Sequence, residues 1–171
     1  MKPELERSEE TFVAIARNFC EWAENPSLEQ EEDFKTAMRL LPKLYAAAIL
    51  LRESGGDDSK WEEIPDDQLR MVYHRFGKLP FNAYGVCFNP LVIPPEEPCV
   101  GSLVDDLGDI YRDVKRALVH YQSGHREQAV WEWRFHFKCH WGRHLSSALH
   151  ALHAHAEVAY WWPVEYSDET D

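Results

Sequence analysis

A chain of 171 residues that is 44% hydrophobic and 13% aromatic can bury one ordinary core, so its composition excludes intrinsic disorder. The formal net charge of −12 opposes nucleic-acid binding, because affinity for phosphate backbones comes mainly from lysine and arginine. No apolar run approaches the roughly 20 residues that span a bilayer, and the polar N-terminus (MKPELERSEE) lacks the apolar core of an export signal. We therefore expect a cytoplasmic protein with one domain over residues 1–171, no membrane or nucleic-acid partner, and a loose acidic tail from about residue 163.

The first three predicted elements are amphipathic helices. Apolar residues recur every three or four positions over residues 8–24, 28–53 and 65–77, which is the period of one helix face. Pro42 lies inside the second pattern, so we expect a kink there or two shorter helices. Gly77 ends the third pattern.

The segment 79–100 (LPFNAYGVCFNPLVIPPEEPCV) is rich in proline and unusually apolar. A solvated linker would carry few large apolar side chains, so we expect an ordered strap that lies on the helices and contains no strand. The large apolar residues of this segment are Phe81, Tyr84, Val86, Phe88, Leu91, Val92 and Ile93.

The C-terminal part of the chain contains two further helix patterns. A clean apolar face over residues 102–122 predicts one helix, and the pattern from about 126 to 160 predicts another. Within the latter, the stretch 131–144 (WEWRFHFKCHWGRH) alternates aromatic and polar residues, which is typical of a strand. We assign it to the helix, because both flanks are helical and no other segment offers a convincing partner strand.

This last helix is predicted to be the centre of the fold. Projected at about 100° per residue, it is apolar around most of its circumference, which indicates packing on both sides in an all-α bundle of about five helices. Arg134 falls inside the apolar sector. The narrow stripe left for solvent consists of Glu132, His136, Cys139, Arg143, Ser146 and His150.

Histidines are the most distinctive residues for chemistry, since the chain has nine and eight of them follow residue 119. His136, His140 and His144 are spaced by four, which lets two rings on one helix face bind the same metal ion. His136 drifts toward the solvent stripe, so we favour His140 and His144 as ligands.

The helix over residues 102–122 offers carboxylates that could complete such a site. A short connection (SGHRE) makes the two helices antiparallel neighbours, which would bring Asp106, Asp109 and Asp113 near the histidines. Mixed carboxylate and imidazole ligands suit Zn, Mn or Fe.

The same residues also fit a purely structural network. Asp109 can pair with Arg112 or Arg116 along its own helix. Asp113 can pair with Arg116, or with Arg134 across the interface, where a buried guanidinium needs a carboxylate. Both interpretations stay open at this point. The candidate polar cluster consists of Asp106, Asp109, Arg112, Asp113, Glu132 and Arg134.

Two long segments carry a family resemblance. GSLVDDLGDIYRDVKRAL (101–118) and AVWEWRFHFKCHWGRHLSSALHALH (129–153) resemble a bacterial family known as domain of unknown function 5063, and the FNPL…EPCVGSL approach to the first segment also fits. The resemblance spans nearly the whole chain. It implies a small, all-helical bacterial protein and brings no assigned activity, cofactor or catalytic residue.

Two hypotheses of function follow from the sequence. The sequence contains no nucleophile elbow, phosphate loop, dinucleotide fingerprint, calcium loop or C-x-x-C pair. This favours a non-enzymatic interaction or regulatory module whose acidic surface binds a protein partner. The alternative is a divalent-metal-binding or metal-dependent protein that uses His140 and His144. A homodimer through Trp161 and Trp162 is compatible with either hypothesis.

Overall fold

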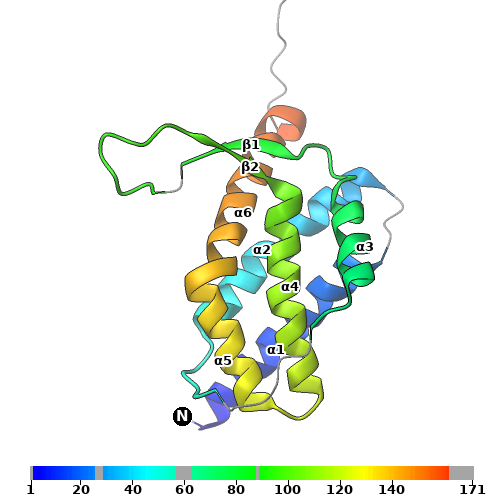
Figure 1. Ribbon diagram of the computed structural model, residues 1–171, viewed down its shortest axis with the longest axis vertical. Coiled ribbons are helices and arrows are strands. Elements are labelled where there is room, and N and C mark those ends of the chain that lie inside the picture. The colour runs from blue at the N-terminus through cyan, green and yellow to red at the C-terminus, as the bar shows by residue number, and fades with distance from the viewer. Residues whose placement is uncertain (1, 26–28, 57–62, 88, 162–171) are drawn as a thin grey trace, which may run out of the picture.

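The fold is the expected all-α bundle, seen in a computed structural model that describes residues 2–25, 29–56, 63–87 and 89–161. Figure 1 shows long helices running side by side along the longest axis of the molecule. The tail from residue 163, Trp162 and the side chain of Trp161 lie outside the described part. The helices are α1 (Lys2–Glu24), α2 (Gln30–Ile49), α3 (Asp66–Phe76), α4 (Leu103–Gln122), α5 (Arg126–His136) and α6 (Gly142–Ala156).

The periodic patterns located the first four helices well. α2 is one helix that continues through Pro42, so the alternative of two shorter helices is wrong. α4 begins where the sequence indicates, because the Ser102 side chain accepts a hydrogen bond from the backbone N–H of Asp105 (3.2 Å). None of the described helices is long and apolar enough to cross a membrane.

The central helix is α4, not the C-terminal helix as the sequence predicted. α4 packs against α1, α3, α5 and α6, and Leu107, Ile110 and Val114 on it are fully buried. The C-terminal helix is divided into α5 and α6 by the π-helical segment η1 (Phe137–Trp141). A second π-helical segment, η2 (Glu157–Trp161), follows α6.

The π-helical segment η1 explains why the angular projection failed. A π-helical turn inserts an additional residue, so the buried faces before and after it differ by about one position, and a projection that fits the later part misplaces the residues that precede η1. Glu132, which the projection placed toward solvent, is fully buried, and Phe135, placed toward the core, is 47% exposed. In the later part the projection held: Cys139, Arg143, Ser146 and His150 are exposed.

Gly142 follows η1 directly and permits it. A Cβ atom at this position would overlap the backbone carbonyl oxygen of Phe137, which cannot move away as a flexible side chain could. The lone glycine in an otherwise helical stretch is therefore required for close approach of the backbone.

The proline-rich segment forms a β-hairpin, which corrects the expectation of a strap without strands. β1 (Ala83–Val86) pairs antiparallel with β2 (Cys99–Ser102), and Tyr84 lies opposite Gly101. Phe81 and Tyr84 pack against the core at the base of the hairpin. Residues 89–98, here called the arm, are exposed throughout and extend away from the bundle (Figure 1).

We predict that Gly142→Ala lowers the free energy of unfolding by about 1–3 kcal/mol, because the added methyl group forces a backbone shift in η1. Urea unfolding followed by circular dichroism measures this change. Gly55→Ala is the matched control, since a Cβ there meets no atom within 4 Å. Equal stability of the two variants would contradict the role of Gly142.

Candidate functional site

Antiparallel packing of α4 against α5, η1 and α6 places a row of charged side chains between them, here called the polar seam. Its members come from one face of each helix and meet in reverse order along the chain, as the sequence predicted for antiparallel neighbours. The polar seam consists of Asp106, Asp109, Asp113, Arg116 and His120 of α4, with Gln128, Glu132, His136, His140 and His144 opposite them.

At one end of the polar seam, Asp106 holds His144. Nδ1 of His144 lies 2.7 Å from Oδ1 of Asp106, a carboxylate that is only 7% exposed. This hydrogen bond raises the pKa of His144 above the usual imidazole value, against the opposing effect of partial burial. Tyr84 of the hairpin donates its hydroxyl proton to Oδ2 of the same aspartate. Its ring packs where a Cβ on Gly101 would otherwise lie.

Asp113, about two turns after Asp106 on α4, holds His140 in the same way. Nδ1 of His140 lies 2.7 Å from Oδ2 of Asp113, which is 4% exposed, and the Arg116 guanidinium lies 3.5 Å from Oδ1. Because a carboxylate only accepts hydrogen bonds, Nδ1 carries the proton in both histidines. The Nε2 atom of each neutral ring therefore presents a lone pair on the opposite side.

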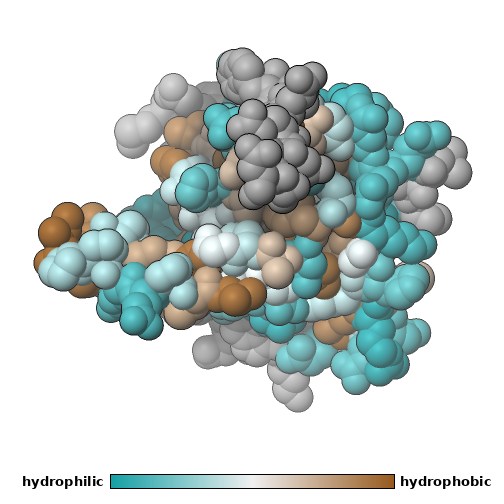
Figure 2. All heavy atoms as spheres, turned by 90° about the horizontal axis from the view of Figure 1, so that it is seen from above, coloured by the Kyte–Doolittle hydropathy of each residue, from teal (hydrophilic) through white to brown (hydrophobic). Residues whose placement is uncertain are grey.

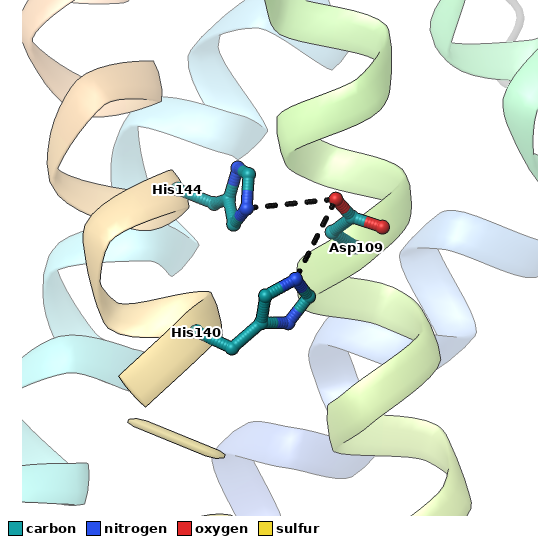
Figure 3. A group of neighbouring side chains, drawn as sticks. All are labelled: Asp109, His140 and His144. Atoms are coloured by element: carbon teal, nitrogen blue, oxygen red, sulfur yellow. Dashed lines mark ion pairs between the residues drawn. The ribbon is translucent and has the colours of Figure 1, made fainter. Parts of the chain in front are cut away.

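Both Nε2 atoms face the same oxygen of Asp109, as Figure 3 shows. Oδ2 of Asp109 lies 3.5 Å from Nε2 of His144 and 3.9 Å from Nε2 of His140. One ligand atom from each of the three residues lies within 4.8 Å of the other two, without an ion. Ligands held about 2.0–2.2 Å from a tetrahedral zinc ion are roughly 3.3–3.6 Å apart, so the two imidazole–carboxylate distances are close to those of a metal site, and the three atoms together, within 4.8 Å of one another, would have to draw closer around an ion.

The other oxygen of Asp109 is oriented by neighbours on two helices. Arg112 lies 2.8 Å from Oδ1, and the hydroxyl of Tyr73 on α3 lies 3.5 Å from it. The Tyr73 ring occupies the space that a side chain at Gly108 would need. These contacts leave Oδ2 directed toward the two histidines.

The inner end of the polar seam is closed to solvent. Glu132 is fully buried, and its Oε1 atom accepts from His120 Nδ1 and Gln128 Nε2, each at 2.8 Å. Its Oε2 atom lies 3.8 Å from Nε of Arg116. The Arg116 guanidinium also lies 3.0 Å from Nε2 of His136.

His136 is oriented differently from the two outer histidines, although its Nδ1 atom lies 3.7 Å from the Asp113 oxygen that holds His140. Its Nε2 atom faces the Arg116 guanidinium and not Asp109. Burial lowers the pKa of His136, which favours the neutral ring beside this cation. The geometry therefore keeps the preference for His140 and His144 as ligands.

The structure brings together five of the six residues of the candidate polar cluster. Arg134 is the exception: it donates to the backbone oxygen of Leu51 and pairs with Glu53 at 3.0 Å, so of the two alternative partners of Asp113 it is Arg116, at 3.5 Å, that is found, and the alternative with Arg134 is wrong. The shift of helix face at η1 is the physical reason, because it places Arg134 beside the segment that follows α2. Arg112 pairs with Asp109 as predicted. Sequence reasoning missed Tyr73, Tyr84, His120 and Gln128, which come from other segments or lack a diagnostic spacing.

Comparisons with known proteins identify the family. Residues 3–157 match the model of the family described as Domain of unknown function (DUF5063), so the chain belongs to that family and the resemblance seen in the sequence is confirmed. No curated protein matches the chain. Protein BF1032 from Bacteroides fragilis, a solved structure, matches with a TM-score of 0.72 and 22% identity over 92% of this chain and 94% of that chain. A likeness at this identity shows the fold alone.

We predict that Glu132→Gln lowers the free energy of unfolding by about 3 kcal/mol, because it removes the fully buried carboxylate that His120 and Gln128 contact at 2.8 Å and that faces the Arg116 guanidinium. Chemical denaturation measures this change. Glu53→Gln is the control, since Glu53 is 84% exposed and surface substitutions change stability by less than about 0.5 kcal/mol. A loss below about 1 kcal/mol in Glu132→Gln would contradict the stabilising role of this buried carboxylate.

Proposed function

We propose that the chain binds one divalent transition-metal ion between α4 on one side and η1 with α6 on the other, through Nε2 of His140, Nε2 of His144 and Oδ2 of Asp109. The observation that carries the proposal is the orientation of the two histidine rings, each of which is fixed by its own aspartate. Each Nδ1 atom is held at 2.7 Å by its own buried aspartate, and both Nε2 atoms point toward the same carboxylate oxygen.

This arrangement matches what metal-ligating histidines need. A carboxylate on Nδ1 fixes the tautomer and the ring orientation and makes Nε2 more basic. A network that serves stability alone needs each imidazole to find a carboxylate, and Asp106 and Asp113 already provide one each. It does not need two lone pairs to meet at a third carboxylate, so the position of Asp109 favours an ion.

The ligand set limits the choice of ion and leaves coordination positions on the ion free for water or a substrate. Two imidazoles and one carboxylate suit Zn, Mn or Fe. Three protein ligands fill fewer positions than such ions require, which leaves room for water or a substrate. His140 and His144 are 32% and 29% exposed, so solvent reaches the edge of the site. A bound water of lowered pKa would support hydrolytic chemistry.

A protein-interaction or regulatory module remains a second candidate function. The exposed apolar side chains of the arm favour it, since such exposure in a soluble protein marks contact surfaces. The two functions are compatible, because the arm and the metal ligands are different parts of the molecule. The cytoplasmic location stays a prediction from composition.

We predict that calorimetric titration of chelator-treated protein with Zn²⁺, Mn²⁺ or, under anaerobic conditions, Fe²⁺ shows one binding site for at least one ion. His140→Ala, His144→Ala and Asp109→Asn each remove a ligand and are expected to weaken binding by more than about 100-fold. Asp106→Asn leaves the ligands in place but loosens one ring, so it should weaken binding by about 10–100-fold. At a free ion concentration of 100 Kd, binding adds about 2.7 kcal/mol of stability, which raises Tm by roughly 5–10 °C.

The matched control is the double variant His150→Ala, His153→Ala, which removes two imidazoles from α6 outside the proposed ligand set. It should bind the ion as the wild type does. Folded wild-type protein that binds none of the three ions would contradict the proposal. Equal binding by wild type and by a folded His140→Ala, His144→Ala double variant would contradict it as well.

A further inference from the structure

We propose that the arm of one copy docks on the groove of a second copy, so that two chains form a symmetric dimer. The groove is a cavity of about 160 Å³ at the surface of α5 and η1, lined by Glu53, Ser54, Trp131, Arg134, Phe135 and Lys138. This inference stands apart from the proposed metal site, because it uses none of the metal ligands.

The arm has the character of an interaction element. Leu91 and Ile93 are each 88% exposed, which is unusual for aliphatic side chains in a soluble chain. Figure 2 shows the arm protruding from the bundle with hydrophobic residues at its tip. Glu96 and Glu97 follow this tip, and residues 89–98 contain no lysine or arginine.

The groove has complementary shape and chemistry. The rings of Trp131 and Phe135 are stacked, with centroids 4.9 Å apart and planes within 9° of each other. Phe135 is 47% exposed although it is a large aromatic residue. A cavity of about 160 Å³ is smaller than the roughly 300–1,000 Å³ of small-molecule pockets. A single aliphatic side chain on an aromatic platform is a better occupant than a small-molecule ligand.

The local charges of the arm and the groove favour the arm as the occupant of the groove. The whole chain carries a net charge of −12, which opposes self-association unless the contact pairs opposite local charges. The arm is acidic, whereas the groove carries the cation Lys138; its other cation, Arg134, is already paired with Glu53 at 3.0 Å. Among the described residues none forms an ion pair with Lys138, so that cation is available to Glu96 or Glu97 of another copy.

The positions of arm and groove favour exchange between two copies. In Figure 1 the arm leaves the bundle at the end where the hairpin lies, while α5 and the segment after α2 lie at the other end of the same side. The arm therefore cannot reach the groove of its own chain. A two-fold axis beside the bundle brings each arm to the groove of the other copy, which closes the assembly with two identical contacts.

Sedimentation equilibrium of the full-length chain tests this inference. We expect a dimer with a dissociation constant on the order of 10 µM, because each contact is small. Ile93→Ser and Phe135→Ser should each weaken the dimer at least tenfold. Met71→Ser is the matched control, since Met71 is 57% exposed on α3 and lies in neither the arm nor the groove; it should leave the dissociation constant unchanged.

A charge exchange distinguishes this pairing from other dimers. Glu96→Lys with Glu97→Lys should weaken self-association, Lys138→Glu should also weaken it, and the triple variant should recover a large part of the loss. Circular dichroism shows whether each variant is folded. A wild-type chain that stays monomeric at about ten times the expected dissociation constant overturns the inference. A dimer that persists unchanged in both Ile93→Ser and Phe135→Ser also overturns it.

Discussion

The structure depends on one constraint: three buried carboxylates at the interface of α4 with α5, η1 and α6 each need a hydrogen-bonding or cationic partner. Asp106, Asp113 and Glu132 are all at most 7% exposed, and an unpaired carboxylate at such a position would cost several kcal/mol. Imidazole and guanidinium groups from α4, α5, η1 and α6 supply the partners. The register between these helices is therefore set by polar contacts as well as by apolar packing.

The π-helical segment η1 is the means by which this register is kept. In a regular α-helix, residues spaced by four advance about 40° around the axis at each step, so Glu132, His136, His140 and His144 would spread over a third of the circumference. A wider turn in the middle of the series compensates for part of this drift. All four side chains then face α4, where each finds a partner on that helix. Gly142 makes the wider turn possible.

The hairpin extends this network to the surface. Asn82 lies at the start of α4, where its side-chain oxygen accepts from the backbone N–H of Val104 at 2.9 Å. Tyr84 donates to Asp106, which in turn holds His144. The base of the hairpin, the beginning of α4 and the proposed metal ligands thus form one connected unit, while the arm beyond it projects into solvent.

The sequence predicted the parts of this account that follow from regular periodicity and short connections. The helix pattern and the SGHRE turn were enough to place Asp106, Asp109 and Asp113 opposite His140 and His144. Arg134, Phe135 and Glu132 were misplaced because an angular projection assumes an unbroken α-helix, and no simple residue pattern announces a π-helical turn. The arm was expected to lie on the helices but is exposed. Apolar residues predict burial, yet they do not say whether the surface that buries them belongs to the same chain.

The central claim is that the fold holds both imidazoles ready for an ion before any ion binds. The most direct measurement is the ¹⁵N NMR spectrum of the histidine side chains in metal-free protein at about pH 9, where imidazoles are neutral. The account predicts that His140 and His144 are both protonated at Nδ1, with Nε2 as the bare nitrogen that responds to added Zn²⁺. Protonation at Nε2, or exchange between the two tautomers as in a free imidazole, would contradict it.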